Sequence, residues 1–149
     1  MTAAFSAEAK EVMHRGFASA RAANHLSMTV EHLVLEMLRD KSVVGYLKKC
    51  GTDIETLKAL LEAKVASFRT AQIQTVETQG NAEFTRVIRR AIDDAGRERR
   101  ESIVLHDLFL AILEETTGFA ASLLLQQTAN PEAFEALRKE RARLAKRTI

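Results

Sequence analysis

The chain has little of what disulfide frameworks, thiolate metal sites and sheets require. It holds one cysteine, one proline, six glycines and no tryptophan among 149 residues. The single Cys50 excludes an intrachain disulfide and any metal site built from several thiolates, and we interpret it as a small apolar helix residue. Few stretches alternate between apolar and polar residues, whereas helical spacing is frequent. The composition therefore argues against a sheet and favours an all-α fold.

Signatures of a membrane segment and of catalysis are also missing. No apolar run approaches the roughly 18 residues of a membrane span, and no secretion signal opens the chain, so we expect a cytoplasmic protein. The motifs Gly-x-Ser-x-Gly, His-Glu-x-x-His and Gly-x-x-x-x-Gly-Lys-Ser/Thr are absent. His32 and Glu36 lie one helical turn apart, but two ligands on one helix do not close a metal site. We expect no enzyme, no ATP-driven motor, no metal and no cofactor.

An apolar stripe at residues 28–38 organises what is present. Its apolar residues recur at i, i+3, i+4, i+7 and i+8, which predicts a short buried helix. Thr29 can cap the first turn, and Met28 with Leu33 occupies the positions of a hydrophobic staple across that cap. The stripe consists of Val30, Leu33, Val34, Met37 and Leu38.

The same pattern returns 75 positions later. The counterparts of the stripe are Leu105, Leu108, Phe109, Ile112 and Leu113. The preceding helix repeats at the same offset, since Ala9, Val12, Met13, Gly16, Phe17 and Ala20 correspond to Phe84, Val87, Ile88, Ala91, Ile92 and Ala95. The second copy has Val104 in place of Thr29, so its side-chain cap is lost, and Asp107 in the first turn could offset the loss. The chain is therefore predicted to be a tandem repeat.

The predicted organisation is one domain over residues 1–149. Repeat one is expected at 5–68, a connection rich in Thr and Gln at 69–81, and repeat two at 82–145. Within the connection, Ile73 and Val76 are too apolar for an idle linker and are candidates to lie against a groove. Local signals divide each repeat into four helices: caps at Ser6 and Asn81, a stop at Gly51, a capping box over Thr52–Glu55, and a last start at Asn130–Pro131.

Positive charge gathers at the C-terminal end. The whole chain has a formal net charge of +2, while residues 138–149 alone carry six Lys and Arg against one Glu. A solvated last helix explains this charge, because cations are favourable at a helix C-terminus. Nucleic-acid binding through residues 138–147 is the alternative, although no aromatic residue is interleaved there for stacking on bases.

Several short segments together resemble a known family. Thr-Val-Glu-His-Leu at 29–33 has an echo at 104–108, Phe-Thr-Arg-Val stands at 84–87, and Thr-Asp-Ile-Glu-Thr-Leu stands at 52–57. In their order, spacing and duplication, these segments resemble the N-terminal domain of Clp-type AAA+ unfoldases of the ClpA and ClpC kind. The resemblance covers residues 5–145. It implies a pseudo-twofold helical bundle of two four-helix units.

The resemblance also implies a function and a site. Such domains dock adaptor proteins of the ClpS kind and unfolded or tagged substrate segments, which pass to an ATP-driven ring; a freestanding relative could instead compete for the adaptors. Glu31 and Arg86 match the adaptor-facing positions, and Thr29, His106 and Asp107 are further partner-binding candidates. ClpC-like members bind phosphorylated arginine with paired acidic residues, but His106 stands where the partner of Glu31 would be. Glu31 also has a structural explanation, since an acidic residue stabilises the first turn of a helix.

Overall fold

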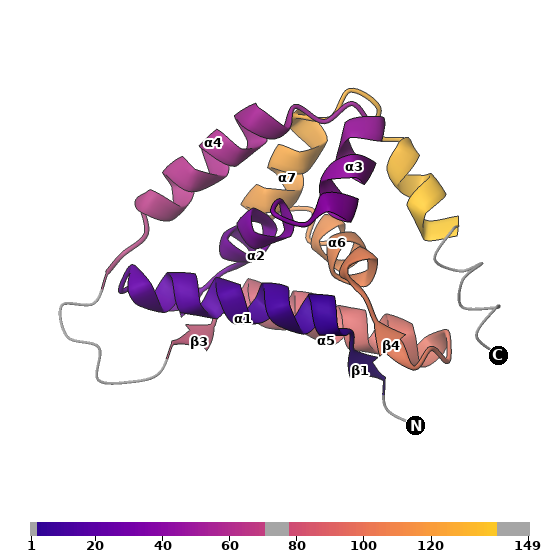
Figure 1. Cartoon of the computed structure of the whole chain (residues 1–149), viewed down its shortest axis with the longest axis horizontal. Coiled ribbons are helices and arrows are strands. Elements are labelled where there is room, and N and C mark those ends of the chain that lie inside the picture. Colours follow the sequence, from indigo (N-terminus) through magenta and orange to yellow (C-terminus); the bar gives the residue numbers. More distant parts are fainter. Residues whose placement is uncertain (1–2, 71–77, 140–149) are drawn as a thin grey trace.

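Residues 3–70 and 78–139 are described by the structure, which is a computed structural model. Over these ranges the chain is built from helices, joined by four strands of two residues each (Figure 1). This confirms the predicted all-α fold class. The strand pairs are absent from the sequence prediction because two residues are too few to show an alternating pattern. Within the described ranges, no helix combines the length and apolar character that a membrane crossing requires.

The two halves of the chain present their elements in the same order. The first half holds β1 (Ala4–Phe5), α1 (Ala7–Ala22), β2 (Ser27–Met28), α2 (Val30–Met37), α3 (Lys41–Lys49) and α4 (Ile54–Ala66). The second half holds β3 (Gln79–Gly80), α5 (Ala82–Arg97), β4 (Ser102–Ile103), α6 (Leu105–Leu113), α7 (Phe119–Gln126) and helical residues 133–139. The strand β3 lies inside the segment that the sequence indicated as a connection.

The strand pairs relate the two halves to each other. β1 pairs in parallel with β4, and β2 pairs in parallel with β3. Because β3 and β4 lie 75 positions after β1 and β2, exchanging the halves turns one pair into the other. On another side of the molecule, the turns before α4 and after α7 meet in an antiparallel bridge, where the hydroxyl oxygens of Thr52 and Thr128 are 2.8 Å apart. This arrangement is consistent with a pseudo-twofold tandem repeat.

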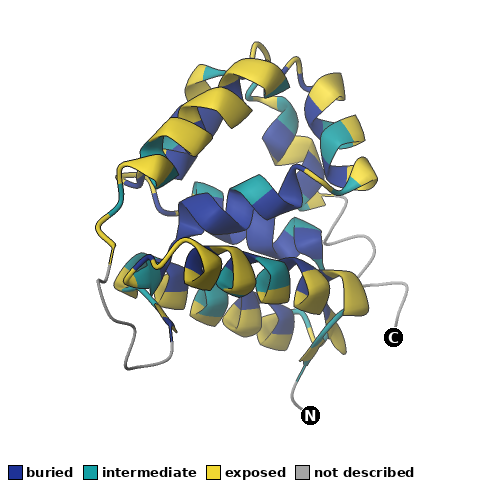
Figure 2. Cartoon of the chain, turned by 60° about the vertical axis from the view of Figure 1, so that its left-hand side comes forward, coloured by how far each residue is buried: buried dark blue, intermediate teal, exposed yellow. Residues whose placement is uncertain are grey.

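The predicted apolar stripes form the core. The central helices α2 and α6 are almost wholly buried (Figure 2), and α1 and α5 pack against them. Full burial of a Leu or Met side chain stabilises the fold by about 1.5–3 kcal/mol. Gly16 leaves room for the end of the buried Met28 side chain, since a Cβ at residue 16 would collide with its Cε. The residues of both stripes are buried except Leu113, which is partly buried.

Three predicted helix caps are confirmed. The side-chain oxygens of Ser6, Thr29 and Asn81 each accept a hydrogen bond from the amide three residues on, at 3.1, 3.3 and 2.9 Å. Each such cap is typically worth about 1 kcal/mol. The predicted stop after α3 is confirmed as well, because Gly51 has a φ of +79°, in the left-handed region that glycine adopts without strain.

Two predicted helix starts are wrong in detail. The N-cap of α4 is Asp53, whose Oδ1 accepts from the amide of Thr56 at 3.1 Å, and not Thr52, whose hydroxyl bonds across to Thr128. The last helix begins at residue 133, two residues after Pro131, because the amide of Ala133 first closes a tight turn onto the Asn130 carbonyl at 3.2 Å. The predictions for Ile73, Val76 and residues 140–149 fall outside the described residues.

Candidate partner-binding site

The first turn of α2 carries two of the predicted site residues, Thr29 and Glu31. The amide of Thr29 donates to Nδ1 of His32 at 3.0 Å, while Thr29 Oγ1 accepts from the His32 amide. These reciprocal bonds hold the turn as a capping box. Thr29 is therefore buried and engaged within its own helix. Glu31 is also largely buried, but its carboxylate makes no hydrogen bond or ion pair with another described residue.

A second carboxylate, Glu83 in the first turn of α5, lies close to Glu31. Burial raises the pKa of the Glu83 carboxyl above its ordinary value, and the negative charges of Glu31 and Glu115 raise that pKa further. Its Oε1 is buried without a hydrogen-bond partner among the described residues. The backbone at Gly118 covers this oxygen closely, since a Cβ there would lie 2.6 Å from it. The charge of Arg86 partly offsets this rise in the pKa of Glu83, and a further cation near Glu31 and Glu83 would offset more of it.

Two arginines of α5 hold the third carboxylate, Glu115. Arg86 donates from Nη2 and Nε to Oε1 of Glu115 at 2.8 and 3.0 Å, and Arg90 donates from Nη1 to Oε2 at 3.0 Å. The Arg86 hydrogen bond is the main cause that lowers the pKa of the Glu115 carboxyl. The Arg86 side chain remains 57% exposed, so its outer edge faces water. We call Glu31, Glu83, Arg86, Arg90 and Glu115 the Glu31 cluster.

An equivalent place exists on the other half of the domain. A pocket of about 260 Å³ is lined by Ser6, Glu8, Asp40, Ser42, Val104, Leu105 and His106. Adding 75 to the first four of these positions gives Asn81, Glu83, Glu115 and Thr117. Subtracting 75 from the last three gives Thr29, Val30 and Glu31. The repeat therefore builds two equivalent sites, one of which is the Glu31 cluster.

The two equivalent sites differ in charge. His106 replaces Glu31, and its ring lies 6.3 Å from the ring of Tyr46. Asp40 replaces Glu115 and caps α3 through the amides of Ser42 and Val43. The hydrogen bond from the Ser42 hydroxyl is the main cause that lowers the pKa of the Asp40 carboxyl. The His106 site thus has fewer carboxylates left to bind a cation than the Glu31 cluster has.

Asp107 is a correction to the predicted site. Its side chain has no exposed surface, and Arg100 binds both of its oxygens, at 2.7 and 2.6 Å. The amide of Val104 also donates to Oδ2 of Asp107, at 2.8 Å. Asp107 therefore stabilises the first turn of α6, as one reading of the sequence predicted, and a partner cannot reach its carboxylate. It leaves the set of partner-binding candidates.

Of the predicted residues, Glu31 and Arg86 come together through Glu83 and Glu115, whereas His106 lies in the equivalent pocket. Sequence reasoning missed Glu83, Arg90 and Glu115. Glu83 could have been found, since it is the first-turn counterpart of Glu8 at the offset of 75. Glu115 is likewise the acidic counterpart of Asp40 at that offset, but only tertiary packing brings it to Arg86 and Arg90 of α5.

Apolar side chains are exposed where the two halves meet above the core. Leu60 of α4 and Phe119 of α7 are 41% and 38% exposed, and the two helices are in contact. The ammonium of Lys64 lies 5.0 Å from the centre of the Phe119 ring. Exposed apolar side chains therefore lie beside a positive charge at this contact between α4 and α7.

Comparisons with known proteins identify the group to which this architecture corresponds. The family model of the Clp repeat (R) N-terminal domain matches residues 4–137. The ClpA homolog protein of Fuscovulum blasticum is 29% identical over 126 residues, which is 83% of this chain and 16% of that relative. The chain therefore spans about a sixth of the length of this curated relative.

Solved structures share the fold. The N-domain of ClpV from Vibrio cholerae has a TM-score of 0.75 at 17% identity, over 95% of this chain and 85% of that one. The complex of the ClpV N-domain with a VipB peptide has a TM-score of 0.70 at 18% identity, over 95% and 87% of the respective chains. At these identities the likeness establishes the arrangement of helices.

Proposed function

Because the chain belongs to the Clp repeat N-terminal domain family, we propose that it is a recognition module that binds adaptor proteins or exposed substrate segments for a Clp-type unfoldase. One observation carries the proposal: Glu31 and Glu83 form a carboxylate pair that has no hydrogen bond or ion pair with another described residue, beside the exposed Arg86. We propose binding, not catalysis, as the role of this cluster. The peptide-bound ClpV N-domain, which has the same fold, supports this choice.

The charges of the cluster suggest how a partner segment would bind. A lysine or arginine side chain, or an N-terminal ammonium, would bind between Glu31 and Glu83 and relieve the repulsion that raises the pKa of Glu83. Arg86 keeps its outer edge free to bind a carboxylate or carbonyl of the same segment, since Glu115 uses only its inner edge. A charge-assisted hydrogen bond of this kind contributes about 1.5–3 kcal/mol.

Apolar contacts would add affinity next to these charges. Leu60 and Phe119 offer exposed apolar surface on helices from different halves of the domain. Apolar anchors with a polar rim are typical of surfaces that recognise protein segments. We therefore expect adaptors or substrates to combine a cationic group with apolar side chains.

The repeat supplies a matched pair of variants for the test. Glu83→Gln alters the Glu31 cluster, and Glu8→Gln alters the equivalent carboxylate in the His106 pocket. A labelled ClpS-like adaptor and a labelled unfolded protein would each be titrated with the full chain, and binding followed by fluorescence anisotropy. We expect Glu83→Gln to weaken binding by about tenfold or more, Glu31→Lys to abolish it, and Glu8→Gln to leave it unchanged.

Two outcomes would contradict the proposal. Equal signals from wild type and Glu31→Lys with both ligands would show that the Glu31 cluster binds neither. An equal loss in Glu8→Gln and Glu83→Gln would show that binding does not distinguish the two sites. Circular-dichroism melting of every variant would confirm that each one remains folded.

A further inference from the structure

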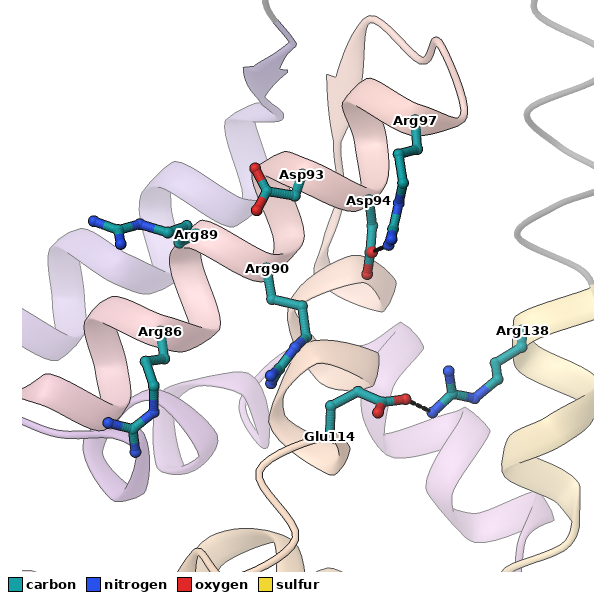
Figure 3. Close-up of a pocket in the computed structure, with 8 residues that line it drawn as sticks. All are labelled: Arg86, Arg89, Arg90, Asp93, Asp94, Arg97, Glu114 and Arg138. Atoms are coloured by element: carbon teal, nitrogen blue, oxygen red, sulfur yellow. Dashed lines mark hydrogen bonds and ion pairs between the residues drawn. The ribbon is translucent and has the colours of Figure 1, made fainter.

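A second charged site lies on the outer face of α5. A cavity of about 520 Å³ opens between α5, the end of α6 and helical residues 133–139, and eight charged side chains line it (Figure 3). Five of them are arginines, so the lining has more positive than negative charge. The arginines are Arg86, Arg89, Arg90, Arg97 and Arg138. Arg86 and Arg90 also connect this arginine cavity to the Glu31 cluster.

Ion pairs hold the arginines in place without using all of their donors. Arg97 pairs with Asp94, and Arg138 pairs with Glu114 across from the end of α6. Arg90 binds Glu115 through Nη1 alone. A guanidinium has five N–H donors, so each of these three retains donors for a ligand. Arg90 is bound to the buried carboxylate of Glu115, so it would lose less freedom on binding than the exposed Arg97 would.

Arg89 differs from the other arginines of the cavity. It is exposed, and it forms no hydrogen bond or ion pair with another described residue. Such a cation at the rim attracts an anionic partner and mainly speeds its association. The lining as a whole is therefore complementary to an anion.

The negative residues of the lining favour a peptide over a nucleic acid. Asp93, Asp94 and Glu114 stand among the arginines and would repel a continuous phosphate backbone. None of the described residues that line the cavity is aromatic, whereas single-stranded nucleic acids are held largely by stacking on aromatic side chains. An acidic peptide instead alternates carboxylates, which pair with arginine, with backbone N–H groups, which can donate to Asp93 or Glu114.

We propose that the arginine cavity binds an acidic segment of a protein partner, whose side-chain carboxylates pair with Arg90, Arg97 and Arg138. The cavity volume falls in the range of about 300–1,000 Å³ that is typical of sites for small ligands and short segments. The proposal rests on the proposed function only in taking a protein as the partner. The arginine cavity uses positive side chains to bind a negative ligand, whereas Glu31 and Glu83 are negative side chains proposed to bind a positive one.

Charge-reversal variants in the last turns of two corresponding helices test the proposal. Arg97 ends α5, and Arg21 lies in the last turn of α1, one residue before the position that corresponds to Arg97, so reversal of either charge has a similar effect on the helix dipole. The probe is a fluorescein-labelled peptide of alternating glutamate and serine, with a glutamine-serine peptide as its control. Binding of the full chain would be measured by anisotropy at low and physiological salt.

We expect the glutamate peptide to bind and the glutamine peptide not to bind. Arg97→Glu combined with Arg138→Gln should weaken binding by about tenfold to a hundredfold, while Arg21→Glu and Glu83→Gln should leave it unchanged. Both sites of the double variant are exposed or partly exposed, and melting curves would verify that it folds.

Three results would overturn the proposal. The first is equal affinity in wild type and in the double variant. The second is an equal loss in Arg21→Glu, which would show that only net charge attracts the peptide. The third is a single-stranded oligonucleotide of the same charge that binds more tightly and displaces the peptide. Failure of the Glu31 cluster would appear separately, in adaptor binding by Glu83→Gln.

Discussion

The paired histidines beside α2 make the fold sensitive to acid. Nε2 of His32 lies 2.9 Å from Nδ1 of His25, and both rings are buried against Phe68. Since the Thr29 amide donates to Nδ1 of His32, the neutral ring carries its proton on Nε2 and donates it to His25. Protonation of His32 would therefore break the hydrogen bond that closes the capping box of α2.

The magnitude follows from the pKa of His32. Burial, followed by the charge of His25, lowers this pKa from 6.5 to about 4. A fall of about 2.5 in pKa, at about 1.4 kcal/mol for each tenfold change in acidity, amounts to about 3 kcal/mol. Between these two pH values the unfolded chain binds more protons than the folded one. The contribution of the neutral His32 ring to the free energy of unfolding is therefore complete above pH 6.5 and is lost as the pH falls toward 4.

The assay compares wild type with His32→Gln in urea unfolding across pH 7.5 to 4. Glutamine does not titrate, and at this position of a capping box its side-chain oxygen can still accept from the Thr29 amide. We expect wild type to lose about 3 kcal/mol more than the variant over this range. Nuclear magnetic resonance titration of the His32 ring should give a pKa near 4.

The reasoning is refuted by either of two results. One is a pH dependence of stability that is the same in wild type and His32→Gln, because the loss would then arise elsewhere. The other is a His32 ring that titrates near 6.5, because burial would then impose no penalty on its charged form. Agreement of both measurements would assign the acid sensitivity to this ring.

Three further substitutions test other parts of the structure. Asp107→Asn should lower the free energy of unfolding by about 3 kcal/mol in urea, because it removes the charge of the buried carboxylate that faces Arg100 and leaves Glu98 as the ion-pair partner of that arginine, and Arg100→Met with Asp107→Leu should recover part of the loss. Glu83→Gln should raise the free energy of unfolding at pH 7 and remove its decline as the pH rises above 4.5, since the raised pKa of Glu83 makes its charged form unfavourable in the folded protein. Gly51→Ala should lower the melting temperature, by the equivalent of about 1 kcal/mol, because alanine is strained at a φ of +79°. If a substitution left the stability unchanged, the feature behind that prediction would be contradicted: the ion pair of Asp107, the raised pKa of Glu83 or the positive φ of Gly51.

Features that depend on neighbouring residues were predictable. The caps at Ser6, Thr29 and Asn81 each join a side chain to an amide three residues away. Both partners of each hydrogen bond therefore lie in the same short segment of sequence. The apolar stripes follow from a helical period that any buried helix must satisfy. Errors arose where a distant segment competed, as at Thr52, whose hydroxyl bonds to Thr128 instead of capping α4.

Features that depend on distant segments were not predictable. From the sequence, the carboxylate of Asp107 could either face a partner or be buried in the domain. In the structure it is buried, because it forms an ion pair with Arg100. The site residues Glu31 and Arg86 were named through a family resemblance, but their connection through Glu83 and Glu115 required the packing of α5 against α2 and the turn after α6. Opposite charges are common on any helical surface, so their pattern along the chain does not reveal which of them meet.

The sequence by itself determined the helical fold class, the repeat at an offset of 75 and the position of most helix ends, since these depend on spacing and on contacts within one turn. Only the tertiary structure decided which charges stay unpaired. Among residues 3–70 and 78–139, Glu31 and Glu83 find no hydrogen-bond or ion-pair partner, whereas Asp107 is neutralised by Arg100. The physical reason is that the energy of a charge depends on burial and on the nearest opposite charge, and both are set by segments far apart in the chain.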